Sequence, residues 1–203
     1  MDSSISQIRS KLERYSPGDL AESSTLAHAA VSILLRDAPA SGDTEVLMIR
    51  RAELPRDPWS GHMGFPGGHV DACDSSPERA GVRETQEELG ISLDSCATRL
   101  GRLSELQASA RSKPIPLSIF PYVYELVKPV DLHPNCEVVE ALWIPLAFFL
   151  SSANRAAMLH PDDHERALSC YRLEDRVVVW GLSLSMLDEL LSLLMEGAAQ
   201  RAE

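Results

Sequence analysis

The chain has 203 residues, of which 44% are hydrophobic, 5% aromatic and 24% charged. These values are typical of a soluble globular chain of about one domain, and they disfavour a disordered, collagen-like or coiled-coil protein. The formal net charge of −11 gives a surface that repels nucleic-acid phosphates and anionic membranes. We therefore expect neither nucleic acid nor a membrane as a partner.

The four cysteines indicate reduced thiols in a cytoplasmic protein. They form no Cys-x-x-Cys pair and have no matching histidine spacing, so they predict neither a zinc site nor a disulfide framework. They are Cys73, Cys96, Cys136 and Cys170. The N-terminus lacks the basic-then-apolar order of a signal peptide. Its weak helical pattern of Ile5, Ile8 and Leu12 is interpreted as packing onto the domain, since Asp2 and Glu13 argue against a transit peptide.

Two short apolar runs near the start predict a β-hairpin. Residues 29–35 and 46–49 are apolar and partly β-branched, and the turn-forming residues 39–43 separate them. Residues 55–68 are dense in Pro, Gly and large apolar side chains, so they predict a shaped loop rather than a flexible linker.

Capping signals predict a helix over residues 77–89. The run 75–78 supplies an N-cap serine, a proline in the first turn and an early acid, and Gly90 supplies a stop.

The rest of the chain mixes strands and helices. Strands are predicted at residues 100–106, 119–127, 138–144 and 177–180, and helices at 146–150 and from about Leu184 through Leu187, Leu191 and Leu194 to Gly197. The last helix suits either the core or an interface. Residues 108–116, with Arg111 and Lys113, are typical of a mobile loop over a site. Without a β-α-β rhythm, these elements indicate one α+β or sandwiched domain.

Three glutamates of the predicted helix share one face. Glu84, Glu87 and Glu88 stand at i, i+3 and i+4, where like charges repel one another. A solvated helix face is one interpretation. We favour a site for a hard cation, Mg²⁺ or Mn²⁺, because carboxylate oxygens are the ligands such ions prefer. Arg83 is placed to orient Glu87, and the Gly67 carbonyl is a further candidate ligand.

The segment resembles the Nudix box, in which a Gly, an acid and an Arg-Glu-x-x-Glu-Glu-x-Gly pattern are spaced along a loop and helix. The matching residues are Gly68, Asp74, Arg83, Glu84, Glu87, Glu88, Gly90 and Ile91. Eight rather than seven residues separate Asp74 from Arg83, and Thr85 stands in an aliphatic position. The resemblance implies a mixed sheet between helices, an α/β/α sandwich with a loop-helix-loop metal site. It also implies one Nudix hydrolase domain over residues 1–203, with its core at about 25–197.

Within that family the chain is similar to the coenzyme A pyrophosphatase group. The similarity rests on Arg50, Arg51, Arg56, Gly61, Asp71, Asp74 and residues 65–68 and 180–183. Ile49 and Ala52 depart from the group's pattern, and an extra residue separates Arg56 from Gly61. The resemblance implies hydrolysis of coenzyme A to 3′,5′-ADP and 4′-phosphopantetheine. ADP-ribose or a dinucleotide polyphosphate is the alternative substrate, and a nucleotide-sensing module without activity is the alternative of another class.

The same resemblance implies roles for individual residues. Glu84, Glu87 and Glu88 are the expected metal ligands, with the Gly67 carbonyl, and Arg83 supports them. The general base is left open among Glu84, Glu137 and Glu140, with a slight preference for a box glutamate. Arg50, Arg51 and Arg56 are expected to face the diphosphate and His62 to bind substrate, while Trp59 either stacks a base or pins its own loop. Nudix proteins often dimerise, so a homodimer is a further possibility.

Overall fold

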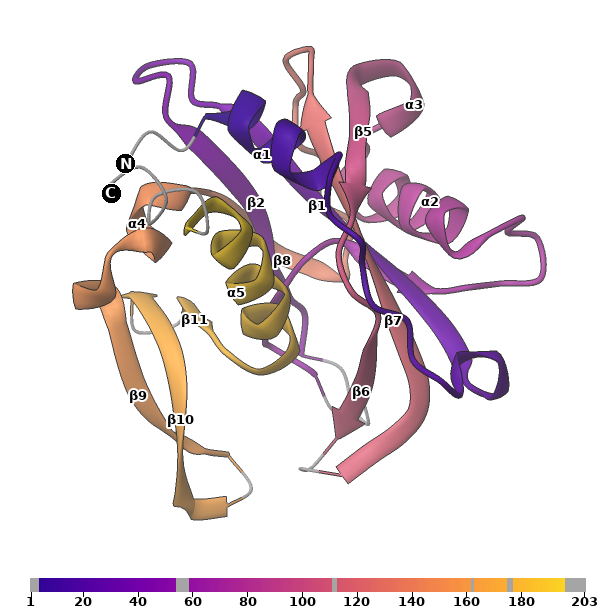
Figure 1. Ribbon diagram of the computed structural model, residues 1–203, viewed down its shortest axis with the longest axis vertical. Coiled ribbons are helices and arrows are strands. Elements are labelled where there is room, and N and C mark those ends of the chain that lie inside the picture. The colour runs from indigo at the N-terminus through magenta and orange to yellow at the C-terminus, as the bar shows by residue number, and fades with distance from the viewer. Residues whose placement is uncertain (1–3, 54–58, 111–112, 162, 175–176, 196–203) are drawn as a thin grey trace.

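A computed structural model describes residues 4–53, 59–110, 113–161, 163–174 and 177–195. Its centre is a mixed β-sheet in which the order of the main strands is β3-β2-β1-β7-β5 (Figure 1). Strands β4, β6 and β8 pair with β1, β7 and β2 respectively. Strand β1 runs parallel to β7, and the other pairings in this sheet are antiparallel.

The strands of this sheet include both predicted arms of the first hairpin. Their bounds are β1 Ala27–Asp37, β2 Thr44–Arg51, β3 Met63–Gly64, β4 Gly67–His69, β5 Ala97–Arg102, β6 Leu106–Ala110, β7 Lys113–Leu126 and β8 Val138–Pro145. The antiparallel register of Leu35 with Val46 confirms the predicted hairpin. The prediction of strands at 119–127 and 138–144 is confirmed as well.

Helices cover both faces of the sheet. Alternate residues of β2 enter different cores: Val46 and Met48 pack on one side, and Leu47 and Ile49 on the other. The first core receives α1 (Ile5–Leu12) and α5 (Gly181–Met195), and the second receives α2 (Pro77–Leu89). Figure 1 shows α5 and α2 on opposite sides of the strands. This is the predicted α/β/α arrangement, and it follows from the period-2 alternation of a sheet buried on both faces.

The terminal helices belong to the first core. Ile5, Ile8 and Leu12 of α1 are buried, which confirms that the N-terminal pattern packs onto the domain. In α5, Leu184, Leu187 and Leu191 are buried against the same cluster, so this helix serves the core. Its predicted end at Gly197 lies outside the described residues. No helix among the described residues is both long and apolar enough to cross a membrane.

Helix α2 begins and ends where the capping signals predicted. The Ser76 side chain accepts the Arg79 N–H at 3.3 Å, Pro77 occupies the first turn, and Gly90 adopts φ = 73°. Thr85, which stands in an aliphatic position of the box, is fully buried and donates to the Gly81 carbonyl at 2.7 Å. Its hydroxyl is therefore satisfied inside the helix.

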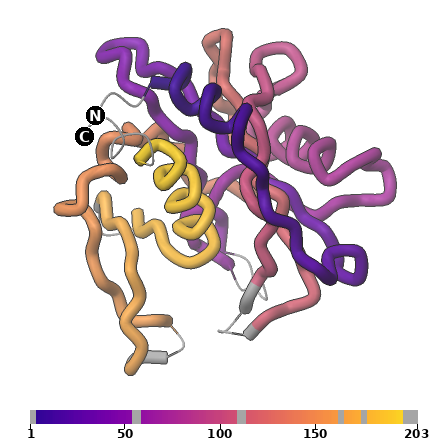
Figure 2. The backbone as a smooth tube through the Cα atoms, in the orientation of Figure 1, coloured from indigo at the N-terminus to yellow at the C-terminus, as the bar shows by residue number. Residues whose placement is uncertain are grey.

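A smaller sheet forms a separate layer near α5. It consists of β9 (Arg155–His160), β10 (Asp163–Glu174) and β11 (Val177–Val179), and its β9–β10 arm extends beyond the helices in Figure 2. Only β11 was predicted. The arm is tied to α5 by Arg155, whose guanidinium binds the Asp188 carboxylate at 2.6 Å. The short helices α3 (Leu93–Cys96) and α4 (Leu146–Leu150) complete the fold, and α4 confirms its prediction.

Two sequence predictions need correction. The single strand expected at 100–106 is divided, because β5 ends at Arg102 and β6 begins at Leu106. Between them Glu105 turns inward and accepts the Leu20 N–H at 2.8 Å. The mobile loop expected at 108–116 is wrong for the described part, where β6 pairs with β7 and Ser109 opposes Pro114. The prolines of this stretch are compatible with β7, because proline is tolerated near the start of a strand.

Candidate metal and substrate site

Strand β4 carries the two glycines on which the site depends. A Cβ atom at Gly67 would lie 2.2 Å from the Ala30 carbonyl oxygen, and φ at this residue is 151°. A Cβ atom at Gly68 would lie 2.5 Å from the carboxylate carbon of Glu84. The β1 backbone leaves no room for a side chain at Gly67, and the absence of one at Gly68 lets the Glu84 carboxylate of α2 lie directly against the backbone of β4.

Glu88 is a buried carboxylate beneath this strand. Only 2% of its surface is exposed, and one of its oxygens accepts the Gly67 N–H at 2.9 Å. The pKa of Glu88 is raised to about 7, mainly by burial and also by the charges of Glu84 and Glu137, while the Gly67 N–H and the charge of Arg51 partly offset the rise. A cation beside this carboxylate would restore its charged form.

Glu84 and Glu87 lie progressively nearer the solvent. The Glu84 side chain is 18% exposed and that of Glu87 is 54% exposed. Burial raises the pKa of Glu84, and Arg83 partly offsets this effect. The predicted stripe therefore runs from the core to the surface rather than along an exposed face, since Glu88 is buried.

Arg83 connects the helix to the preceding loop. Its guanidinium donates to Asp74 at 3.0 Å, to Glu84 at 2.8 Å and to Glu87 at 3.1 Å, and it also reaches the carbonyl oxygen of His69. The hydrogen bond from Arg83 keeps the pKa of Asp74 below its usual range. Asp74 also accepts the Asp71 N–H at 2.9 Å, so its extra spacing in the box still allows it to order this loop.

The donor set fits a hard divalent cation. It consists of carboxylate oxygens, one of them buried with a raised pKa, beside a backbone that lacks side chains. Among the described residues, no three acidic, His or Cys side chains already enclose an ion-sized space. Arg83 binds Glu84 and Glu87, so a cation held by these carboxylates would share them with the guanidinium or displace it.

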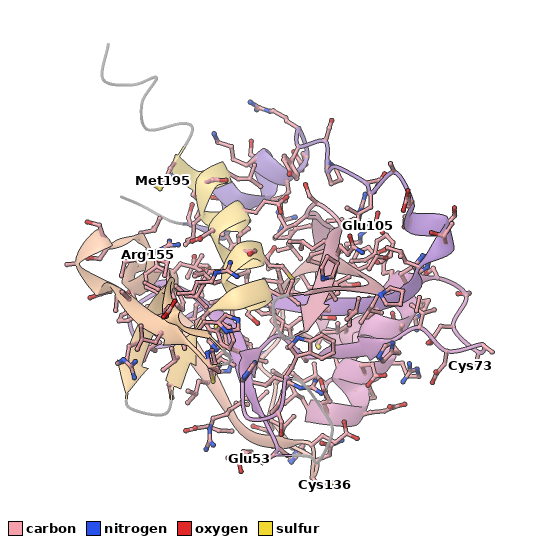
Figure 3. The ribbon with its side chains drawn as sticks, turned by 90° about the horizontal axis from the view of Figure 1, so that it is seen from below. Glu53, Cys73, Glu105, Cys136, Arg155 and Met195 are labelled. Atoms are coloured by element: carbon pink, nitrogen blue, oxygen red, sulfur yellow. The ribbon has the colours of Figure 1, made fainter. Side chains whose placement is uncertain are left out.

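The two downstream candidates for the general base have different surroundings. Glu140 forms an ion pair with Arg50 at 3.4 Å across β2 and β8. Glu137 is exposed, and its charge contributes to the raised pKa of both Glu84 and Glu88. Cys136, which precedes Glu137, lies beside Glu53 at one edge of the molecule (Figure 3). The two segments are joined there, because the Ala52 N–H donates to the Glu137 carbonyl at 2.7 Å.

Backbone hydrogen bonds fasten the loop before β8 to the end of α2. The His133 N–H donates to the Leu89 carbonyl and the Asn135 N–H to the Glu88 carbonyl, both at 2.9 Å. The Asn135 side-chain oxygen accepts the Glu137 N–H at 2.8 Å. Asn135 therefore contacts both Glu88, a candidate metal ligand, and Glu137, a candidate general base. The sequence alone does not indicate this role, because an isolated Asn before a strand carries no distinctive signal.

A cavity of about 300 Å³ adjoins β4. Arg51, His62 and Trp59 line it, as does the backbone of Gly67 and Gly68. Arg50 is not among its described lining residues and pairs with Glu140 instead, so the structure separates the two neighbouring arginines. Arg56 lies outside the described residues.

The cavity wall also contains residues that sequence analysis did not assign to a site. Trp180, Leu182 and Met186 line it from the start of α5, and Pro161 lines it from the β9–β10 turn. In the sequence, the Trp-Gly pair at 180–181 contributes only to the similarity to the coenzyme A pyrophosphatase group. The position of the β9–β10 turn beside the cavity depends on the fold and cannot be predicted from a single sequence.

Comparison with known proteins agrees with these observations. Residues 26–164 match the family model described as a NUDIX domain. An uncharacterised Schizosaccharomyces pombe protein, C14C4.10c, is 35% identical over 55% of this chain, and the match spans 35% of that protein. Human mitochondrial coenzyme A diphosphatase NUDT8 is 27% identical over 85% of this chain and 72% of its own. The Nudix hydrolase NudL of Klebsiella pneumoniae is 29% identical over 90% and 89% of the two chains.

Solved structures share the fold. A Caenorhabditis elegans Ap4A hydrolase complex superimposes with a TM-score of 0.51 and 20% identity, covering 85% of this chain and 99% of that one. A MutT/nudix family protein from Enterococcus faecalis gives a TM-score of 0.56 and 17% identity, covering 96% and 76%. At these identities the likeness concerns the fold alone.

Proposed function

This chain belongs to the Nudix family of pyrophosphohydrolases, and we propose that it hydrolyses the diphosphate of coenzyme A or a derivative in the presence of Mg²⁺ or Mn²⁺. The products are 3′,5′-ADP and 4′-phosphopantetheine. The observation that carries the proposal is the position of the Gly67–Gly68 backbone between the carboxylates of Glu84 and Glu88 and a cavity that Arg51 lines. The similarity to NUDT8 over most of this chain supports coenzyme A as the substrate.

In this proposal the box glutamates hold the metal and Arg51 holds the diphosphate. Glu84, Glu87 and Glu88, with the Gly67 carbonyl, are the ligands, and bound Mg²⁺ supplies polarisation of the phosphoryl oxygens and a lower pKa of the attacking water. Arg51 binds phosphate oxygens through its planar guanidinium. We assign the general base to Glu137, because its charge acts on Glu84 and Glu88 while Glu140 is paired with Arg50.

The assignment of the general base defines where the water proton goes and which bond breaks. Water attacks one phosphorus of the diphosphate, Glu137 takes the water proton, and the bridging oxygen leaves on the second phosphate. The Arg83 network keeps the loop and helix in register during this step, since one guanidinium binds Asp74, Glu84 and Glu87. The proposal therefore assigns metal binding, proton removal and substrate orientation to separate groups.

Product identification tests the proposal. The purified full chain is incubated with coenzyme A and Mg²⁺ or Mn²⁺, and the products are separated chromatographically. We expect 3′,5′-ADP and 4′-phosphopantetheine in equal amounts, and none after metal chelation. Parallel reactions contain ADP-ribose and diadenosine tetraphosphate, the alternative substrates. A higher kcat/KM for either would reassign the substrate, and binding without any product under both metals would support a nucleotide-sensing module.

A further inference from the structure

The walls of the cavity beside β4 are mostly apolar. Trp59, Phe65 and Trp180 contribute rings, and Val31, Ile119 and Met186 contribute aliphatic or thioether groups. Among the described lining residues, Arg51 is the one whose side chain carries a permanent charge. Such walls favour an uncharged ligand group, because burial of a charge without a partner is costly. The cavity volume of about 300 Å³ is sufficient for an extended organic group.

Trp180 is held in this wall from two sides. The His62 ring packs against its indole at a centroid distance of 4.8 Å, and the His160 ring at 5.9 Å. His62 precedes β3, His160 ends β9, and Trp180 precedes α5, so three distant segments meet here. A ring fixed in this way loses little freedom when a ligand contacts it.

The cavity and the carboxylates are close neighbours. Gly67 and Gly68 line the cavity, while the first binds Glu88 and the second lies against Glu84. Arg51 also lines the cavity, together with these two glycines. A diphosphate that contacts Arg51 next to β4 can therefore direct one of its two substituents into the apolar space.

We propose that this cavity binds the uncharged arm of the substrate, which is the pantetheine arm in coenzyme A, and that Trp180 is a specificity-determining residue contacting it. The inference rests on the proposed function. The other substituent of coenzyme A, 3′-phosphoadenosine, carries an additional phosphate that these apolar walls do not match. The preferred substrate class is a diphosphate that bears an extended uncharged group on one phosphate.

A binding experiment tests which half of the substrate enters the cavity. The Trp143→Phe variant removes the one tryptophan that does not line it, so the emission then comes from Trp59 and Trp180. Without metal, 4′-phosphopantetheine and 3′,5′-ADP are titrated separately. We expect 4′-phosphopantetheine to change the emission and 3′,5′-ADP to leave it nearly unchanged, and Trp180→Phe in the same background to remove most of the response. A response to 3′,5′-ADP alone, or a response to 4′-phosphopantetheine that Trp180→Phe leaves at full size, would overturn the inference, whereas a smaller residual response comes from Trp59, which lines the same cavity.

Kinetics give an independent readout. Trp180→Ala is expected to raise KM for coenzyme A by about tenfold or more and to change kcat by less than about threefold, with Trp180→Phe between it and the parent. Leu182→Ala, at a second position in the wall, should raise KM in the same direction. Trp143→Phe is the matched control. An unchanged KM in both Trp180→Ala and Leu182→Ala would overturn this inference and leave the proposed function standing. A parent chain inactive on coenzyme A would instead refute the proposed function.

Discussion

Glu88 accepts the Gly67 N–H at 2.9 Å from a position where 2% of its surface is exposed. This contact fixes a carboxylate of α2 under β4, the strand that borders the cavity. It also places the negative charge where water cannot stabilise it, which is why burial is the main cause of the raised pKa of Glu88. A divalent cation is the partner that makes such a position favourable.

Replacing Glu88 by Gln should separate activity from folding. The amide keeps the size of the side chain and avoids burial of a charge, so we expect the variant to fold with a thermal midpoint no lower than that of the parent. Loss of a metal ligand should lower activity on coenzyme A by at least about a hundredfold. Glu22→Gln removes an equal charge at an exposed residue and should retain parental activity. Near-parental rates in Glu88→Gln would mean that the metal binds elsewhere.

The sequence predicted α2 completely because its signals are local. Ser76, Pro77 and Gly90 act within one turn of the helix ends, and the structure bears out each of them. The burial of Glu88 was not predictable from the same helix. Periodicity placed three glutamates on one face, but the depth of that face depends on β4, which is brought there by its pairing with β1.

Long-range strand pairing also explains other differences between the sequence predictions and the structure. Arg50 and Glu140 were separate candidates in the sequence, and they meet only because β2 pairs with β8 across 90 positions. Strand β9 was missed because most of its side chains alternate between exposed and half-buried positions, and β10 because residues 165–167 are exposed in succession while the neighbours Cys170 and Tyr171 are both buried. A half-buried sheet of this kind gives a weak hydrophobic pattern.

The raised pKa of Glu88 predicts a pH-dependent stability in metal-free protein. Its folded-state pKa is about 7 against 4.5 for a solvent-exposed glutamate, so protonation favours the folded state. The stabilising contribution is fully present below about pH 4.5, and it is lost as pH rises toward and through 7. Denaturant unfolding of parent and Glu88→Gln in chelator, between pH 5 and 8, measures it as a difference. We expect the variant to gain stability relative to the parent as pH rises, and a constant difference would contradict the assignment.

Metal binding should show the opposite pH dependence. Because a carboxylate must lose its proton to coordinate a cation, Mg²⁺ or Mn²⁺ affinity should rise with pH through about 7, and binding should release protons below that value. Titration calorimetry in two buffers with different ionisation enthalpies measures the released protons. Glu88→Gln should bind more weakly and release fewer protons. Proton release equal to that of the parent would assign the titration to another group.

A methyl group at Gly68 should disturb the site directly. The added Cβ atom of Gly68→Ala would meet the Glu84 carboxylate at 2.5 Å, and that carboxylate must move away. We expect a loss of about 1 kcal/mol or less in the free energy of unfolding, because the atoms that must move are the end of a flexible side chain. Activity should fall by at least about tenfold, since the metal ligand is displaced. Gly18→Ala is the control, because its Cβ atom would lie 3.6 Å from the nearest atom, the Ser104 hydroxyl oxygen. Parental activity in Gly68→Ala would show that Glu84 is not needed where it lies.

Asn135 should act through Glu137. Its N–H binds the Glu88 carbonyl and its side-chain oxygen accepts the Glu137 N–H, so Asn135→Ala releases the Glu137 backbone while the contact to α2 is retained. We expect kcat to fall by about tenfold with KM and metal affinity unchanged, and Asn135→Asp, which keeps the acceptor, to recover most of the activity. Glu137→Gln should lower kcat by about a hundredfold or more. If Asn135 acts only by positioning this carboxylate, adding Asn135→Ala to Glu137→Gln should cause little further loss. A full additional tenfold loss in the double variant would mean that Asn135 has a role independent of Glu137.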